Sequence, residues 1–247
     1  MSASFSSASS QGLVLSSAPI SGFPISVAMW IYPTTTGSEK HYWRYGNSAS
    51  ATAGVDLGQS SGNKWQMAGD DGSTFDRAEV GTVTANQWAF VVGRFLAANE
   101  RYMSVLEYNG PVSAVSSTVN KTFSGNWMSV GRRNGTAAAS FWDGSIAEFW
   151  YTNVDIQPGG GALQESVLRQ LAFGGPFSLP HIAKDIVEYH SFRRGLSSDE
   201  DVVGEVYFGA AGRQAWVDST NAGTLGPHPP LPYWYRSPAD RETALIV

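Results

Sequence analysis

Four aromatic residues are the first candidates for ligand binding in this chain: Trp43, Tyr45, Trp65 and Trp142. Each stands beside a segment rich in turn-forming residues, so we expect its ring to lie near the surface. The sequence contains nine Trp, more than a core needs, and exposed aromatic rings mark interaction sites. Because the apolar face of a sugar stacks on Trp or Tyr, these residues predict glycan binding. The alternative is packing beneath a C-terminal segment or in a subunit interface.

Three aspartates, Asp70, Asp71 and Asp76, fall within one short polar segment. Carboxylates are the hard oxygen ligands that Ca²⁺ prefers, so this segment is a candidate calcium site. The alternative is that they are ordinary solvated acids of a turn. The chain has no cysteine, which excludes disulfides and thiolate metal sites. The histidines show no metal-ligand spacing; they are His41, His181, His190 and His228.

Glu148 is an acid within a strongly apolar segment, and it raises the question of catalysis. Glycoside hydrolysis needs two carboxylates that flank the sugar bond, about 5 Å apart in retaining enzymes. No acid lies two or four positions from Glu148, and the acidic run at 199–205 has the form of a capped turn or a short helix. We therefore predict that Glu148 is a structural residue that accepts hydrogen bonds, and that the chain is not an enzyme.

The segment that carries Glu148 is predicted to be a strand covered on both sides. Residues 144–151 alternate strictly, and both of the resulting faces are apolar or aromatic. Ile146, Glu148 and Trp150 are expected on one face, opposite Ser145, Ala147, Phe149 and Tyr151. A second such strand spans residues 25–32, with Ile25, Val27, Met29 and Ile31 on one face and Trp30 and Tyr32 on the other.

Further strands are predicted along the first part of the chain, at 41–45, 54–57, 64–68, 88–95, 102–108 and 127–131. Turn signals separate them, such as Asn109-Gly110. The chain has 27 Gly and only 15% charged residues, which suits short strands joined by tight turns. We predict an all-β, two-sheet antiparallel sandwich over residues 1–157.

Residues 158–247 follow a different pattern and are predicted as a second region. A helix is expected at Ala162–Ala172, with an apolar stripe formed by Leu163, Val167, Leu168 and Leu171. Beyond it, residues 186–192 resemble a strand and a Pro-rich stretch occupies 227–232. We expect this region to be one short helix followed by an irregular extended arm, which packs on the sandwich or on a neighbouring subunit.

Four stretches carry a resemblance to a known family: Ile25–Pro33, Asn86–Phe90, Tyr108–Gly110 and Trp142–Trp150. They occur in the order seen in laminin-G-like, concanavalin A-like jelly rolls, and the chain resembles the group of such proteins encoded by tailed phages and prophages. In that group the jelly roll is followed by a helix, a Leu-Ala-x-Gly-x-x-Pro stretch and a Pro-rich tail. Leu171–Pro176 departs slightly from that spacing.

The resemblance implies a jelly-roll sandwich and a non-enzymatic structural protein of a phage virion, such as a capsid decoration or accessory protein. The implied partners are the major capsid protein or other virion proteins. A homo-oligomer, for example a trimer, is expected on a symmetric particle. The alternative is a lectin module that binds glycans for attachment to a host or environmental surface. Laminin-G and lectin jelly rolls often place acidic and carbonyl oxygens on loops at one end, which agrees with the calcium candidate.

Composition argues against two other classes of partner. The net charge is −5 and no basic face is visible, so we expect no nucleic-acid partner. No stretch approaches the roughly 18 apolar residues of a membrane span, so we expect no membrane partner. The first residues lack the basic and apolar regions of a signal peptide, and we expect a virion protein made in the host cytoplasm.

Overall fold

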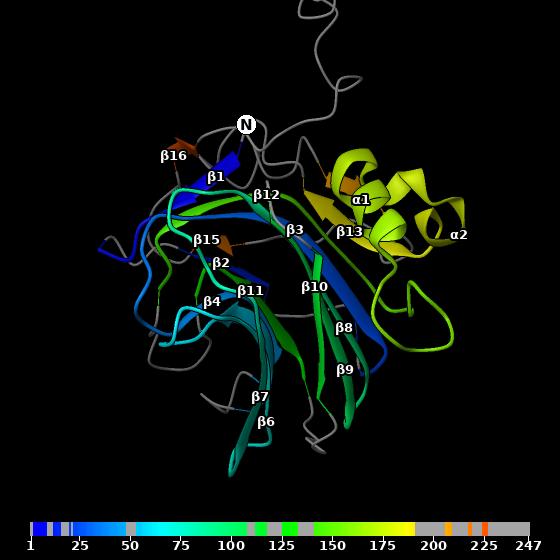
Figure 1. The fold of residues 1–247 in the computed structure, drawn as a ribbon, viewed down its shortest axis with the longest axis horizontal. Coiled ribbons are helices and arrows are strands. Elements are labelled where there is room, and N and C mark those ends of the chain that lie inside the picture. Colours follow the sequence, from blue (N-terminus) through cyan, green and yellow to red (C-terminus); the bar gives the residue numbers. More distant parts are fainter. Residues whose placement is uncertain are drawn as a thin grey trace, which may run out of the picture.

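The computed structural model describes residues 2–8, 12–15, 20, 22–47, 53–107, 112–117, 125–132, 141–190, 206–208, 217–218 and 224–226. Within these ranges, two antiparallel sheets face each other, with β4, β6 and β7 on one side of Figure 1 and β3, β8, β9 and β10 on the other. The predicted all-β two-sheet sandwich is confirmed. None of the helices in these ranges is long and apolar enough to cross a membrane.

The first sheet, called sheet A, has the order β10-β9-β8-β3-β12-β1-β16, and β13 and β14 extend it beside β12. Its strands are β10 (Val112–Ser117), β9 (Glu100–Glu107), β8 (Ala89–Ala97), β3 (Ile25–Pro33), β12 (Gly144–Thr152), β1 (Ser2–Phe5), β16 (Thr224–Gly226), β13 (Ile186–His190) and β14 (Val206–Phe208). β1 and β13 share the same edge of β12, because β1 pairs with its first residues and β13 with its last.

The second sheet, called sheet B, has the order β15-β2-β11-β4-β5-β6-β7. Its strands are β15 (Val217–Asp218), β2 (Leu13–Leu15), β11 (Trp127–Val130), β4 (Lys40–Gly46), β5 (Gly54–Gln59), β6 (Trp65–Asp70) and β7 (Phe75–Val80). The predicted strands 41–45, 54–57, 64–68, 88–95 and 127–131 correspond to β4, β5, β6, β8 and β11 with shifted ends. Predicted strand 102–108 corresponds to β9, but residue 108 and the Asn109-Gly110 turn lie outside the described residues.

The main core lies between the sheets and confirms the pattern predicted for β3. Ile25, Val27, Met29 and Ile31 are fully buried in this inter-sheet core. Trp30 points to the opposite, outer face of sheet A. Alternation identified the faces of this strand because its ladder to β8 runs without a bulge, so the period of two holds along its whole length.

β12 departs from the predicted alternation because it contains a β-bulge. Its register to β3 shifts between Ala147 and Trp150, and Glu148 has a positive φ of 51° there. The extra residue reverses the facing of the side chains beyond the bulge. Ile146 and Phe149 lie in the inter-sheet core, whereas Ala147 and Trp150 lie on the outer face of sheet A. The prediction that Ile146 and Trp150 share a face is therefore wrong, as is the prediction that Ala147 and Phe149 do.

A second core covers the outer face of sheet A. Helix α1 (Glu165–Gly174), a 3₁₀ turn (Pro176–Ser178) and helix α2 (Pro180–Ala183) lie beside β12 and β13 (Figure 1). The helix predicted at 162–172 spans 165–174, so Leu163 lies before it. The buried face is confirmed, since Leu168 and Leu171 are buried, Val167 packs against this core, and Leu163 joins it from outside the helix. The Trp30 indole N–H donates to the Ala172 carbonyl at 3.0 Å, which ties α1 to β3.

The region after residue 157 therefore packs on the sandwich as far as His190. Two of its later short strands also join the sheets, because β15 pairs with β2 and β16 with β1. The predicted strand at 186–192 is β13, and its last two positions lie outside the described residues. The acidic run 199–205, the Pro-rich stretch 227–232 and His228 also lie outside the described residues.

Candidate functional site

The four aromatic residues predicted to bind glycans are buried. Trp43 and Trp142 are 0% exposed, and Tyr45 and Trp65 are 1% exposed. The prediction that these rings lie at the surface is wrong, because Trp43, Tyr45 and Trp65 on their strands, and Trp142 just before β12, all point into the space between the sheets. Trp142 packs on Tyr42 with ring centroids 5.2 Å apart, and Trp43 packs on Phe95 of sheet A at 5.8 Å. None of the four offers a ring face to a sugar.

Tyr45 shows how these rings are held. Its hydroxyl oxygen lies 2.8 Å from the Ile20 carbonyl oxygen and 2.9 Å from that of Gly125, and it can donate its proton to either. Burial of the phenol raises the pKa of Tyr45 to about 12. A Cβ added at Gly125 would lie 2.3 Å from the Tyr45 ring, so the close approach requires glycine there. That Tyr45 adjoins a turn-rich segment in the sequence gives no information on the direction of its side chain, which points inward.

The three candidate calcium ligands are engaged separately. Asp71 accepts hydrogen bonds from the backbone N–H groups of Ser73 and Thr74 and from the Ser73 hydroxyl, which lowers its pKa. Asp70 accepts the Gly72 N–H at 2.7 Å, and Asp76 forms an ion pair of 2.6 Å with Arg101.

In the described residues, no group of three or more His, Asp or Glu side chains is placed to hold a metal ion. The predicted calcium site is therefore not assembled there. The alternative interpretation, acids of a β-turn, fits Asp70 and Asp71 in the β6–β7 hairpin. Asp76 instead joins the two sheets, because it lies on β7 of sheet B and Arg101 lies on β9 of sheet A.

Buried polar clusters account for two of the histidines. His41 lies 3.4 Å from Asp56, which pairs with Arg44 at 2.8 Å. His190 lies 2.7 Å from Glu188, whose other oxygen accepts the Tyr151 hydroxyl proton at 2.6 Å. All of these residues are at most 2% exposed, so neither cluster presents a ligand-binding surface.

Glu148 accepts a hydrogen bond within sheet A. The Tyr189 hydroxyl of β13 donates to the Glu148 carboxylate across the β12 bulge. Sequence reasoning could not find Tyr189, because the pairing of β13 with β12 brings together residues separated by about forty positions.

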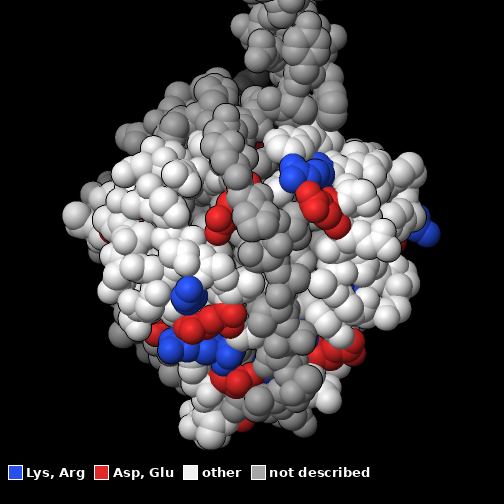
Figure 2. Space-filling view, in the orientation of Figure 1, with Lys and Arg blue, Asp and Glu red and all other residues white. Residues whose placement is uncertain are grey.

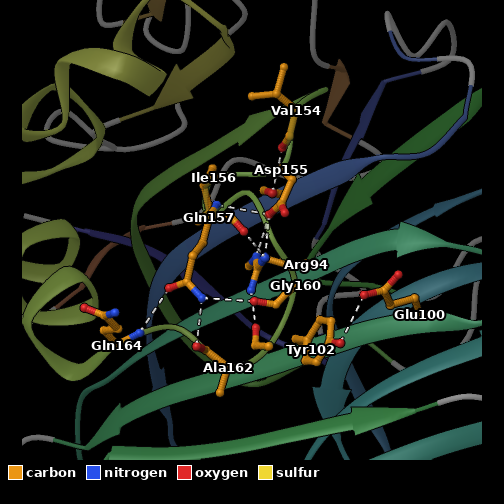
Figure 3. Close-up of polar contacts among 12 residues, drawn as sticks. Arg94, Glu100, Tyr102, Val154, Asp155, Ile156, Gln157, Gly160, Ala162 and Gln164 are labelled. Carbon is orange, nitrogen blue, oxygen red and sulfur yellow. Dashed lines mark hydrogen bonds and ion pairs between the residues drawn. The ribbon is translucent and has the colours of Figure 1, made fainter.

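Arg94 organises the loop between β12 and α1 (Figure 3). Its Nε and Nη2 atoms donate to Asp155 Oδ1 at 2.8 and 2.6 Å, and its Nη2 and Nη1 atoms donate to the Gln157 and Gly161 carbonyls at 2.8 and 2.5 Å. The Gln157 amide donates to the Ala162 carbonyl and accepts the Gln164 N–H. These donors and acceptors bind one another, so the Arg94 network fixes the loop and leaves Arg94 with no exposed surface.

A hollow among the described residues combines aromatic and exposed polar groups. It encloses about 170 Å³, including the part open to solvent, and lies where β6 of sheet B approaches β8 and β9 of sheet A. We call it the Trp65–Glu107 hollow. It is lined by Trp65, Thr82, Thr84, Gln87, Trp88, Ala89 and Glu107. Of the residues predicted to bind glycans, only Trp65 contributes to it, as a wall.

The segment between β7 and β8 forms the rim of the hollow and is held at several points. The Val83 N–H donates to the Asn63 carbonyl at 2.8 Å, and the Val83 side chain is buried in the inter-sheet core. The Asn86 N–H donates to the Pro33 carbonyl at 2.7 Å, with Asn86 at a φ of 61° that suits an Asn in a turn. Thr84 lies between these anchors and Thr82 and Gln87 flank them, and all three side chains are exposed.

Two hydrogen bonds orient the polar groups of the hollow. The Trp65 indole N–H donates to Glu107 Oε1 at 3.2 Å, and Lys64 Nζ donates to Thr82 Oγ1 at 3.2 Å. Trp88 is only 7% exposed, and its ring packs on Tyr32 at 5.3 Å between centroids. The hollow therefore offers indole edges as a rigid wall, with hydroxyl, amide and carboxylate groups at its mouth.

The face drawn in Figure 2 shows no large patch of one charge among the described residues. Lys and Arg groups lie next to Asp and Glu groups in small clusters. Such mixed charge supplies no extended positive field on that face. The aromatic lining of the hollow is thus a better guide to a ligand than the distribution of charge on that face.

Comparison with known proteins identifies a family model that matches the chain and several solved structures with a similar fold. A family model described as the concanavalin A-like lectin/glucanases superfamily matches residues 7–156. No curated protein sequence matches the chain. A putative carbohydrate binding protein from Bacteroides ovatus aligns over 91% of this chain and 61% of its own, with a TM-score of 0.53 and 10% identity.

Two further solved structures have a TM-score of 0.50. A native heptameric SAP-like pentraxin from Limulus polyphemus is 12% identical, and the alignment covers 69% of this chain and 80% of the pentraxin. Full-length tailspike protein 2 from an Escherichia coli O157:H7 bacteriophage is 13% identical, and the alignment covers 76% of this chain but 26% of the tailspike. At such identities the likeness is one of fold.

Proposed function

Because the chain belongs to the concanavalin A-like lectin/glucanases superfamily, we propose that it is a non-catalytic carbohydrate-binding module and that the Trp65–Glu107 hollow is its binding site. The observation that carries the proposal is the composition of this hollow. Indole edges of Trp65 and Trp88 suit the C–H groups of a sugar, and the Thr, Gln and Glu groups suit its hydroxyls.

The anchoring of the hollow supports this proposal. Its lining residues come from β6, β8, β9 and the segment before β8, and hydrogen bonds to Asn63 and Pro33 hold that segment. A site built on strands loses little conformational freedom when it binds a ligand. The Bacteroides ovatus protein is named as a putative carbohydrate binding protein, and its likeness supports the proposal only at the level of fold.

A non-catalytic role is supported by the placement of Glu148. Its carboxylate accepts the Tyr189 hydroxyl proton within the sheet, so it does not face the hollow. Among the lining residues, Glu107 is the acid, and two carboxylates are required for ordinary glycoside hydrolysis. We propose binding without bond cleavage, and incubation with the bound oligosaccharide followed by product analysis would reveal a hydrolase.

The direct test is a glycan array probed with the full chain and with Thr84→Ala and Gln87→Ala variants. Both residues are exposed, so neither change should unfold the protein. Matched controls are Ser166→Ala on α1 and Asn153→Ala after β12, which remove similar groups outside the hollow. We expect the wild-type chain to bind glycans. The two hollow variants should bind more weakly, and the two control variants should bind as the wild type does. Binding that survives both hollow variants unchanged would move the site elsewhere.

A role in a phage virion is a second proposal, carried by the order of elements along the chain. The jelly roll is followed by α1, whose end carries the start of the stretch Leu171–Pro176, and this order resembles the phage-encoded group although the spacing departs slightly. We propose that the module is displayed on the particle as a homo-oligomer attached to the major capsid protein or another virion protein. Electron cryomicroscopy of the source particle tests this, and particles that lack the chain would reject it.

A further inference from the structure

We propose that two copies of this chain pair through strand β7, so that their sheets B join into one continuous sheet across a two-fold axis. β7 is the last strand of sheet B, and in the described part of the chain it forms a ladder only with β6. β10, the last strand of sheet A, lies close to β7 but forms no ladder with it. A strand at the end of a sheet presents backbone N–H and C=O groups that another strand can bind. The proposal is independent of glycan binding and names a surface for self-association.

An exposed aromatic ring stands at the beginning of this strand. Phe75 is 45% exposed, and no other large apolar side chain of the described residues is exposed. Its ring lies on the outer face of sheet B, because β7 turns Ala78, three positions away, toward the inter-sheet core. Covering this ring with a second copy would remove apolar surface from water and so favour association.

Two opposite charges follow Phe75 on the same outer face. Arg77 Nε lies 3.1 Å from Glu79 Oε1, and the two side chains are 39% and 33% exposed. A two-fold axis perpendicular to the sheet brings the outer face of one copy beside the outer face of the other, so it must pass through a residue position of β7 and not between two. Two such axes keep five residues of each strand paired, one at Arg77 and one at Ala78.

The charges distinguish these two registers. An axis at Arg77 places Arg77 against Arg77 of the partner subunit, and Phe75 against the partner's Glu79. An axis at Ala78 instead places Arg77 against Glu79 of the partner subunit, and symmetry repeats this pair on the other side of the axis. Opposite charges directly across two strands are favourable, whereas like charges are destabilising. Charge complementarity therefore selects the axis at Ala78.

The inward-pointing acid of β7 does not prevent this pairing. Inward charges on an end strand discourage another chain from adding to the sheet. Asp76 is such a residue, but it forms an ion pair of 2.6 Å with Arg101 of β9, which balances its charge within the chain. In the Ala78 register it lies across from the partner's Val80. Because only five residues pair on each strand, the interface is small, and we expect a weak dimer that depends on concentration.

Sedimentation equilibrium of the full chain from about 1 μM to 1 mM tests the pairing, because this range covers the dissociation constants of small interfaces. We expect a wild-type dimer whose dissociation constant rises about tenfold in Glu79→Arg and in Arg77→Glu, since each change places two like-charge pairs across the axis. Both side chains are exposed, so both variants should keep the wild-type unfolding midpoint in urea. The matched control is Glu165→Arg on the surface of α1, which makes the same change in net charge and should leave the dissociation constant unchanged.

Charge reversal supplies a test that misfolding cannot imitate. The double variant Arg77→Glu/Glu79→Arg restores opposite charges across the axis, and an equimolar mixture of the two single variants does the same between unlike copies. We expect the double variant and the mixture to dimerise as the wild type does. A wild type that stays monomeric over the whole concentration range would overturn the proposal, as would a dimer that neither single variant weakens. Failure of the double variant and of the mixture to recover the dimer would overturn it as well.

Discussion

Removal of the Asp155 carboxylate should destabilise the fold far more than removal of an exposed ion-pair partner. The Arg94 guanidinium is fully buried, and Asp155 supplies the carboxylate that balances its charge (Figure 3). Asp155→Ala leaves this guanidinium with only the Gln157 and Gly161 carbonyls. It also removes the acceptor of the Gln157 N–H, which lies 3.0 Å from Asp155 Oδ1.

The magnitude depends on burial. Breaking a buried pair by removing one partner costs about 3–5 kcal/mol. The Asp155 side chain is 19% exposed, so water can enter beside Arg94 and replace part of the loss. We therefore expect about 3 kcal/mol, at the lower end of that range. For a chain of this size, the loss corresponds to a Tm lowered by roughly 6–12 °C.

The matched control is Glu165→Ala, which removes the partner of Arg169 on the surface of α1. The Arg169 and Glu165 side chains are 49% and 57% exposed, and such an i,i+4 pair contributes about 0.3–0.5 kcal/mol. Urea denaturation followed by tryptophan fluorescence measures both variants against the wild type. Native-state hydrogen exchange should also show earlier opening of residues 153–164 in Asp155→Ala. A cost for Asp155→Ala no larger than that for Glu165→Ala would refute the reasoning.

Three further predictions concern the bulge, a buried phenol and the acidic hairpin. Glu148→Gly should be more stable than Glu148→Ala by about 1 kcal/mol in the free energy of unfolding measured in urea, because only glycine relieves the positive φ while both variants lose the carboxylate. Equal stability of the two variants would contradict backbone strain at residue 148. Tyr45 titrates near pH 12 in the folded chain and near 10 when unfolded, so its contribution to stability is complete below pH 10 and falls as pH rises toward 12. Tyr45→Phe should flatten that decline in alkaline denaturation curves, and an unchanged slope would count against the assignment. Calcium should not raise the Tm relative to a chelator, since Asp71 and Asp76 are already engaged by the hairpin and by Arg101; a calcium-dependent rise of several degrees would show a site that this arrangement does not explain.

The sequence predicted the fold well where local pattern decides structure. β3 alternates without interruption, and α1 carries its apolar residues at helical spacing, so the buried faces of both could be predicted. β12 could not, because a bulge adds one residue without changing composition. When both faces of a strand are apolar, no polar residue marks where the facing reverses, and the alternation appears intact across the bulge.

The candidate site was harder to predict, for a related physical reason. Trp43 and Trp142 adjoin turn-rich segments, but Trp43 on β4 and Trp142 just before β12 both point into the inter-sheet core. Proximity to a turn indicates where a strand ends and says nothing about which face a side chain takes. The excess of Trp over a single core was real, and part of it is explained by a second core under α1, which takes Trp30, Trp88 and Trp150.

The residues that form the hollow share no local signal because they meet only through tertiary structure. Trp65 begins β6, Glu107 ends β9 and Thr84 lies before β8, so two sheets must close before the three approach one another. The sequence of Gly81–Trp88 indicates only a turn. In the structure, the buried Val83 side chain anchors this segment in the inter-sheet core. At the proposed site, this anchoring means that binding energy would not be spent on ordering the segment.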